Sequence, residues 1–257
     1  MAVEWHDILL LGLAAFLAGF VDAVVGGGGL IQLPAALIIL PSFPVSSVIA
    51  SLKIPAFSGT SVAAWQYVKK VSINWKLLSV ICTLAFFASY SGSFLLTQVS
   101  NRFMKPVLLL ILIAVAVYTY TKKDLGQREQ KDIAASRQLQ LGIAISLVVG
   151  FYDGFIGPGA GSFLMLAFIA FLHFDFLHAS AHAKLVNLAT NLGSVALFLT
   201  KGNIVWEIAL PMAAANMLGG FAGAKLAIAK GNKFIRVFFL VVIVGILARF
   251  CWDVFQR

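Results

Sequence analysis

Long apolar runs, separated by short polar interruptions, make up most of this chain, and they fall into two sets of five. Most of them approach or exceed the ~20 residues that a helix needs to cross the ~30 Å hydrocarbon core of a bilayer. Residues 29–40 and 160–172 are shorter, and each follows a cluster of glycines. The pattern predicts an all-α polytopic membrane protein in which two short helices do not span the core comfortably. The predicted segments are 8–24, 29–40, 46–68, 75–98 and 103–121, then 139–156, 160–172, 178–199, 204–229 and 234–252.

The composition agrees with this class of protein. Hydrophobic residues make up 61% of the chain and charged residues 11%, whereas soluble proteins carry about 25% charged residues. The formal net charge is +9, but the basic residues are scattered between apolar runs and form no stripe that could follow a phosphate backbone. We therefore expect the lipid bilayer, and no nucleic acid, as a partner.

The two sets of segments are related by an internal repeat, because seven identities lie 131 positions apart without a gap. The identical residues include aspartate, lysine and tryptophan as well as glycine, so the repeat duplicates functional elements as well as packing. Such a duplication is typical of secondary transporters. Residues 1–121 then form a first transmembrane repeat, residues 122–138 a charged cytoplasmic linker, and residues 139–257 a second transmembrane repeat. The identical pairs are Gly19 and Gly150, Asp22 and Asp153, Gly26 and Gly157, Gly28 and Gly159, Lys53 and Lys184, Trp75 and Trp206, and Gly92 and Gly223.

The first short segment returns the chain, at Pro41–Ser47, to the side where it started. The first repeat then makes an odd net number of crossings, and the second repeat is inverted relative to it. This arrangement places most basic residues on one face, which should be cytoplasmic, and both termini on the outer face of the inner (plasma) membrane. Eight simple spans with parallel repeats are the alternative. The predicted cytoplasmic residues are Lys69, Lys70, Lys76, Lys122, Lys123, Arg128, Lys131, Arg137, Lys230, Lys233 and Arg236, and the outer ones are Arg102, Lys105, Lys201, Arg249 and Arg257.

Each glycine cluster joins a long helix to a short one and predicts a deliberate break, since successive glycines let the backbone leave helical geometry. Such a break is tolerated at membrane depth only beside protein or a water-filled cavity. The N-termini of the two short helices would aim backbone N–H groups at that cavity, near the midplane, and form an anion site. The alternative is close helix packing, which we expect instead at Gly12, Gly19, Gly219 and Gly223. The predicted substrate-binding backbone comprises Gly26, Gly27, Gly28, Gly29, Gly157, Gly159, Ala160 and Gly161.

Four charged residues lie within apolar segments, where an ionisable group is costly unless it faces a cavity or a partner. Asp22 and Asp153 precede the glycine clusters, and we expect them either to carry a coupling proton or to hold the broken backbone by accepting its N–H bonds. Lys53 and Lys184 either bind substrate or extend to the membrane surface. The helix of Lys184 continues with a polar stripe, so the second half should supply more substrate contacts. That stripe consists of Lys184, Asn187, Thr190, Asn191 and Ser194, of which Asn187 and Asn191 are predicted substrate ligands.

Other reactive side chains point to no cofactor and no catalytic residue. His178 and His182 have a spacing that suits a metal, but the first half has no counterpart, so capping or gating roles are favoured over a metal site. Cys82 and Cys251 lie inside apolar runs and are expected to be packing residues. The chain contains no G-x-x-x-x-G-K-[ST] motif for ATP.

Three motifs, VDAVVGGGGLIQLPA, GFYDGFIGPGAGSF and AHAKLVNLATN, resemble the TauE/SafE family of sulfite and organosulfonate exporters, in its YfcA-like branch of probable membrane transporters. The resemblance extends from about Gly12 to Trp252. It places the first family motif on Gly26–Gly29 with Pro34, and the second on Gly157–Gly161 with departures from glycine at Pro158 and Ala160. The family implies a multi-pass transporter that moves small sulfur-containing anions, mostly outward, without ATP.

Taken together, these features predict a secondary active transporter that exports a small anion, with sulfite or an organosulfonate as the substrate and with proton coupling as one option. An anion channel would use the same helix dipoles without coupling carboxylates, and an intramembrane enzyme would rely on the histidine cluster. Inverted repeats favour alternating access over both. A homo-oligomer is compatible with the sequence.

Overall fold

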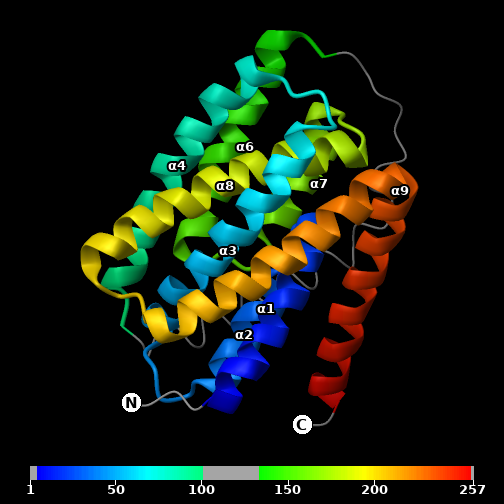
Figure 1. Ribbon diagram of the computed structural model, residues 1–257. Helices are drawn as coiled ribbons and strands as arrows, with labels where there is room; N and C mark the ends of the chain where they lie inside the picture. The colour runs from blue at the N-terminus through cyan, green and yellow to red at the C-terminus, as the bar shows by residue number, and fades with distance from the viewer. Residues whose placement is uncertain (1–4, 101–132, 256–257) are drawn as a thin grey trace.

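The computed structural model of the protein describes residues 5–100 and 133–255, and within these ranges every regular element is an α-helix. The predicted segment 103–121 and most of the predicted linker lie outside the described residues. The segment predicted from residue 139 begins four residues earlier, at Ala135. The helices are α1 (Trp5–Val25), α2 (Gly29–Ile39), α3 (Val45–Val68), α4 (Trp75–Gln98), α6 (Ala135–Phe155), α7 (Ala160–Leu172), α8 (Phe176–Lys201) and α9 (Trp206–Phe255), as shown in Figure 1.

The lengths of the helices confirm the predicted mixture of long and short segments. Five helices are long and apolar enough to cross a membrane, whereas α2 and α7 have 11 and 13 residues. At 1.5 Å per residue these two reach only about 16 and 20 Å, well short of the ~30 Å core. The helix α3 has 24 residues and is long enough, but it is not one of these five.

Local sequence signals explain where several helices begin and end. Asn74 caps α4 by accepting a hydrogen bond from the backbone N–H of Leu77 at 3.2 Å. Asp175 caps α8 in the same way, with His178 as the donor at 2.9 Å. Gly202 ends α8 with a left-handed φ of 66°. Such caps satisfy backbone groups that have no partner inside the helix.

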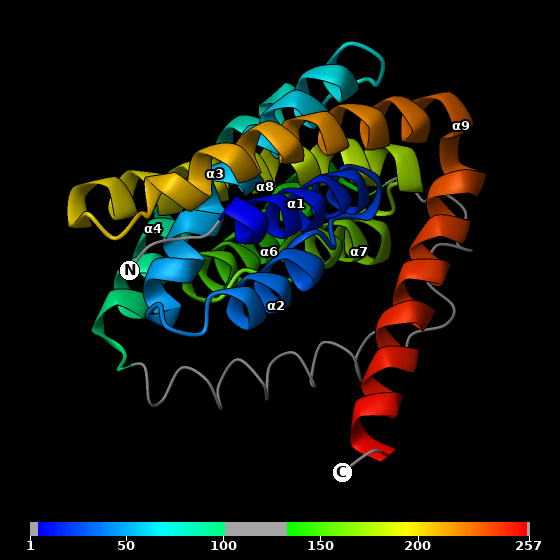
Figure 2. The same cartoon turned by 60° about the horizontal axis from the view of Figure 1, so that its bottom comes forward.

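The last helix bends sharply at one residue. Gly231 has φ 67° and ψ −161° inside α9, a conformation outside the helical region that glycine tolerates. Figures 1 and 2 show the C-terminal arm, drawn in red, turning away from the bundle. The bend confirms the sequence prediction of two segments on either side of residues 230–233.

The two halves pack against each other in a reciprocal way. By the offset of 131 positions, α1 corresponds to α6, α3 to α8, and α4 to the first arm of α9. The helix α1 packs on α9 while α6 packs on α4, and α3 packs on α9 while α8 packs on α4. Each of these helix contacts therefore occurs twice, with the two halves exchanged, as expected for two repeats related by a two-fold rotation.

Glycines permit several of these close helix contacts. A Cβ atom at Gly223 would meet the backbone of Phe20, and one at the equivalent Gly92 would meet the backbone of Phe151. Gly19 and Gly219 also lie against neighbouring backbone, which confirms their predicted packing role. Gly12 does not, since none of the described residues lies within 4 Å of a Cβ placed there. The packing prediction was therefore wrong at that position.

The distribution of polar side chains is that of a multi-pass membrane protein. Large apolar residues such as Leu9, Phe87, Val148 and Leu218 are exposed on α1, α4, α6 and α9. Most of the buried polar and charged side chains instead belong to α3 and α8, which pack against each other in the middle of the bundle (Figures 1 and 2). Cys82 packs against the apolar core as predicted, and the side chain of Cys251 lies outside the described residues.

Candidate functional site

The two helix breaks depend on glycines in conformations that other residues rarely adopt. Between α1 and α2, Gly26 has a φ of 81°. Between α6 and α7, Gly157 and Gly159 have φ values of 95° and 83°. A side chain at any of these positions would be strained. The predicted interruption of both long helices is therefore present in the structure.

The two breaks touch each other. The backbone N–H of Ser162 donates to the carbonyl of Gly26 at 3.0 Å, and its hydroxyl donates to the carbonyl of Val25 at 2.8 Å. A Cβ at Gly26 would meet the backbone of Gly161, and a Cβ at Gly29 would lie 3.0 Å from the Cα of Pro158. The prediction that the broken helices meet is confirmed, and the contact is so close that it requires glycine.

The buried Lys53, Asp153 and Lys184 and the partly buried Asp22 form two ion pairs, each of which joins one half to the other. Lys53 Nζ lies 2.9 Å from Oδ1 of Asp153, and Lys184 Nζ lies 2.8 Å from Oδ2 of Asp22. Because Lys184 and Asp153 are the repeat equivalents of Lys53 and Asp22, the two pairs are the same interaction made twice, with the halves exchanged. Both lysines are buried and do not extend to the protein surface.

Each carboxylate accepts further hydrogen bonds from side chains. Asp153 accepts from Asn187 Nδ2 at 3.1 Å and from Thr190 Oγ1. Asp22 accepts from Thr60 Oγ1 at 3.3 Å. Within the described ranges these partners are lysines, hydroxyls and an amide, rather than the backbone N–H groups that we expected as one option.

Lys53 also stabilises the end of the broken helix α6. Its Nζ donates to the backbone carbonyl of Asp153 at 2.6 Å, in the last turn before the break. The carbonyls of a last helical turn lack intrahelical partners and carry partial negative charge. One lysine therefore satisfies both the side chain and the backbone of Asp153.

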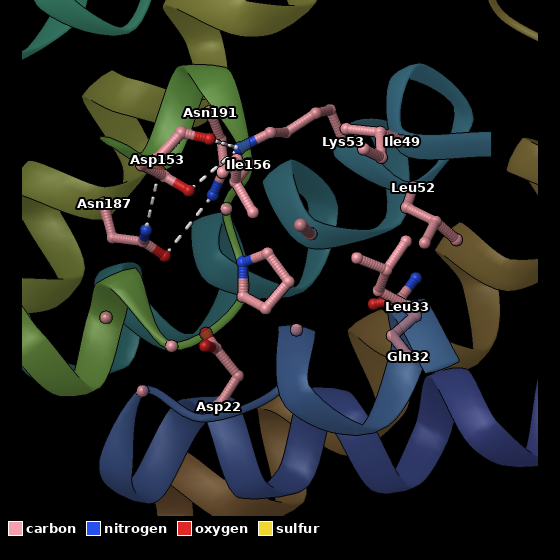
Figure 3. Close-up of a pocket in the computed structure, with 17 residues that line it drawn as sticks. Asp22, Gln32, Leu33, Ile49, Leu52, Lys53, Asp153, Ile156, Asn187 and Asn191 are labelled. Atoms are coloured by element: carbon pink, nitrogen blue, oxygen red, sulfur yellow. Dashed lines mark hydrogen bonds and ion pairs between the residues drawn. The ribbon is translucent and has the colours of Figure 1, made fainter. Parts of the chain in front are cut away.

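A pocket with about 500 Å³ of space opens beside the two breaks. Figure 3 shows Lys53 reaching Asp153, to which Asn187 is also hydrogen-bonded, with Asp22 across the pocket and Gln32, Leu33 and Leu52 on another side. Ten of the predicted site residues line it: Asp22, Gly26, Gly29, Lys53, Asp153, Gly157, Gly159, Gly161, Asn187 and Asn191. Gly27, Gly28, Ala160 and Lys184 are near these residues in the chain or paired with them, but they do not line the pocket.

The electrostatics of the pocket favour an anion. The carboxylates and ammonium groups cancel within their pairs, whereas α2 and α7 both begin at its wall, near Gly29 and Gly159. Several N–H groups in the first turns of α2 and α7, including that of Ser162, already donate to backbone carbonyls, so what each helix end offers the pocket is mainly about half a unit of positive charge. Two such ends at one pocket form an environment in which a small oxyanion is stabilised without a free cationic side chain.

The rest of the polar stripe of α8 contributes to packing. Ser194 Oγ lies 2.8 Å from Ser89 Oγ and accepts a hydrogen bond from Ser93 Oγ at 2.9 Å. Thr190 contacts Asp153, as described above. The stripe therefore faces the protein interior along its length, but only Asn187 and Asn191 of its members border the pocket.

Several pocket residues were not predicted from the sequence. Ile49, Leu52 and Ile156 are apolar residues in apolar segments, so nothing in the pattern distinguishes them. Pro158 was noted only as a departure from the glycine motif. Gln32 could have been identified, because it is the one polar side chain of α2, Gly29–Ile39.

The histidines lie away from this pocket, where the turn between α3 and α4 meets the start of α8. His178 Nδ1 lies 2.6 Å from Asp175 Oδ2, and its Nε2 lies 3.1 Å from Ser72 Oγ. His182 Nε2 accepts from the backbone N–H of Asn74 at 3.2 Å. These contacts link the two repeats at one end of the bundle.

Comparison with known proteins gives one consistent result. Residues 11–250 match the family model described as Sulfite exporter TauE/SafE. A "Probable membrane transporter protein" of Haemophilus influenzae is 34% identical over 249 residues, covering 96% of each chain. Proteins of the same description from a Sinorhizobium species (ORF9) and from Escherichia coli K12 (YfcA) are 34% and 32% identical, covering 98% and 95% of this chain and 95% and 91% of theirs. No solved structure gives a significant match.

Proposed function

Because this chain belongs to the TauE/SafE family, we propose that it is a secondary active transporter of the inner membrane that exports a small anion, sulfite or an organosulfonate. The substrate binds in the pocket between the two helix breaks. The observation that carries this proposal is the position of that pocket: residues of both repeats line it, and the two exchanged ion pairs lie at its wall or directly behind it.

The reciprocal packing supports alternating access. In such a molecule each half can adopt the conformation of the other. The exchanged state makes the same set of contacts, so the two states have similar energy. A substrate held where the halves meet can then be exposed first to one side and then to the other. The inverted orientation of the repeats is part of this proposal.

The ion pairs offer a route to proton coupling. An anion that reaches the helix N-termini competes with Asp153 for Lys53, whose ammonium group borders the same pocket. A buried carboxylate that has lost its cation is strongly destabilised, and taking up a proton relieves that cost. Each anion that binds to Lys53 then brings one proton to Asp153.

The test is flux of radiolabelled sulfite in proteoliposomes, with and without an imposed pH gradient. Wild-type protein is expected to give flux that the gradient drives, and Asp153→Asn and Lys184→Ala should lower it at least about tenfold, since each leaves a buried partner unpaired. The exposed carboxylate variant Glu207→Gln is the matched control and should keep wild-type flux.

Each opposite result has a definite meaning. Flux that follows the membrane potential and ignores the pH gradient identifies an anion channel. Consumption of sulfite without transfer across the bilayer identifies an enzyme. Wild-type flux that survives both site substitutions contradicts the assignment of the pocket.

A further inference from the structure

Gln32 is a buried polar side chain at the pocket whose amide donor has no partner in the part of the chain that the structure describes. It lies in α2, lines the pocket and is 3% exposed. Among the described residues, its Nε2 is the one buried side-chain nitrogen or oxygen without a hydrogen-bond partner. Buried polar groups are nearly always satisfied, so an unsatisfied amide at a pocket wall indicates a partner that binds there.

The orientation of this amide follows from its neighbour. Asn216 Nδ2 in α9 donates to Gln32 Oε1 at 3.3 Å, which occupies the carbonyl end and leaves the NH₂ group for another acceptor. Asn216 is itself buried, and side chains at Gly19 or Gly59 would collide with it. Figure 3 shows the Gln32 amide nitrogen on the side of Leu52.

This pair breaks the repeat. The position equivalent to Gln32 in the second half is Phe163, and the position equivalent to Asn216 in the first half is Ala85. At the two equivalent positions the halves therefore pack against each other without an amide. A polar pair that the duplicated fold does not need, at the wall of the binding pocket, fits a role in recognition.

The surroundings of Gln32 indicate what it recognises. Gln32 follows Gly29, the first residue of α2, by three residues, or about 4.5 Å along the helix axis. Leu33, Ile49 and Leu52 form an apolar wall beside it. A ligand whose anionic group lies at the helix N-terminus would thus place a short carbon segment against this wall and a second acceptor at Gln32.

We propose that Gln32 is a specificity residue that donates from Nε2 to a carbonyl or carboxylate oxygen on the organic part of a sulfonate substrate. The sulfonate group itself binds at the N-termini of α2 and α7. This inference rests on the proposed function and narrows it, because it favours organosulfonates with a second oxygen function over bare sulfite.

The test uses two sulfonates of equal charge and nearly equal shape. Acetonesulfonate carries C=O at the position where methallylsulfonate carries C=CH₂, so only the first can accept a hydrogen bond there. Binding of both compounds and of sulfite is measured by calorimetry on the purified full-length protein in detergent. The wild-type protein is expected to bind acetonesulfonate at least about tenfold more tightly than methallylsulfonate, because a site built to donate a hydrogen bond discriminates against an analogue that cannot accept it.

Two substitutions remove the donor in different ways. Gln32→Met keeps the size of the side chain, and Gln32→Glu replaces the NH₂ group by an oxygen that accepts when ionised. In Gln32→Met the preference for acetonesulfonate should fall to about one while sulfite binding stays within about twofold of wild type. Gln32→Glu should also lose the preference. Gln98→Met, at an exposed glutamine near the end of α4, is the matched control and should behave as wild type.

The outcomes separate this inference from the proposed function. A wild-type protein without preference, a preference that survives Gln32→Met in folded protein, or an equal loss of all three ligands would overturn the role of Gln32 while leaving the transporter intact. Absence of binding for all three compounds to wild-type protein would contradict the proposed function, and the inference would fail with it.

Discussion

Lys53 and Lys184 each neutralise a carboxylate that the other half of the chain supplies, across sequence separations of 100 and 162 residues. Neither charge could remain buried alone, because removing an ion from water costs several kcal/mol even after the protein relaxes. The two pairs therefore fix how the halves meet. They also leave the pocket nearly neutral, because each ammonium group is paired with a carboxylate.

The first prediction concerns the stability of one of these pairs. Lys53→Met leaves the Asp153 carboxylate buried without its cation and should lower the free energy of unfolding by about 3–5 kcal/mol. The double variant Lys53→Met/Asp153→Leu removes both charges and should recover most of that loss. Thermal unfolding in detergent measures both variants. A double variant no more stable than Lys53→Met would show that the pair is not what stabilises this region.

The elements follow from the sequence to different degrees. Apolar runs predicted the long helices, and the glycine clusters predicted both short ones, because helix length and glycine content are local properties. The region around Gly231 was predicted as a boundary for the same reason. The exchange of ion-pair partners could not be read from the sequence, since the repeat identifies equivalent residues but not which of them touch. Gly12 shows the same limit, because a glycine that packs and one that faces open space look alike in a single sequence.

A second prediction concerns the break between α1 and α2. Gly26→Ala places a Cβ against the backbone of Gly161 and Ser162 at a φ of 81°. The positive φ alone costs about 1–3 kcal/mol, and the collision should force the two breaks apart and abolish transport. Gly12→Ala, inside the preceding helix α1 and with no described atom within 4 Å of the added Cβ, is the control and should keep full transport with stability raised by about 0.5–1 kcal/mol. Equal behaviour of the two variants in unfolding and flux assays would contradict the required close contact.

At the scale of the whole molecule, the structure is two similar halves built around a shared pocket. Polar residues of α3 and α8 lie in the interior, and large apolar residues cover α1, α4, α6 and α9. This distribution gives the molecule an apolar surface and a polar interior. The proposed mechanism uses halves that run in opposite directions through the membrane, which is a testable property of equivalent positions.

Lys70 and Lys201 provide that test, since they are exposed and lie at equivalent positions of the two repeats. In a background with Cys82→Ser and Cys251→Ser, a membrane-impermeant maleimide applied to intact cells should label Lys201→Cys. Lys70→Cys should be labelled only after the membrane is permeabilised. Inverted repeats place equivalent positions on opposite faces. Labelling of both from the same side would demonstrate parallel repeats and exclude the proposed topology.

The most direct measurement of the central claim is proton uptake when sulfite binds to the purified protein. Calorimetry in two alkaline buffers of different ionisation enthalpy, at a pH where sulfite carries no proton, gives the number of protons taken up per bound anion. Wild-type protein should take up about one, because the anion displaces Asp153 from Lys53 and the freed carboxylate is buried. Asp153→Asn should bind sulfite without proton uptake. Binding to wild-type protein with no proton uptake would contradict the coupling of anion and proton at this ion pair.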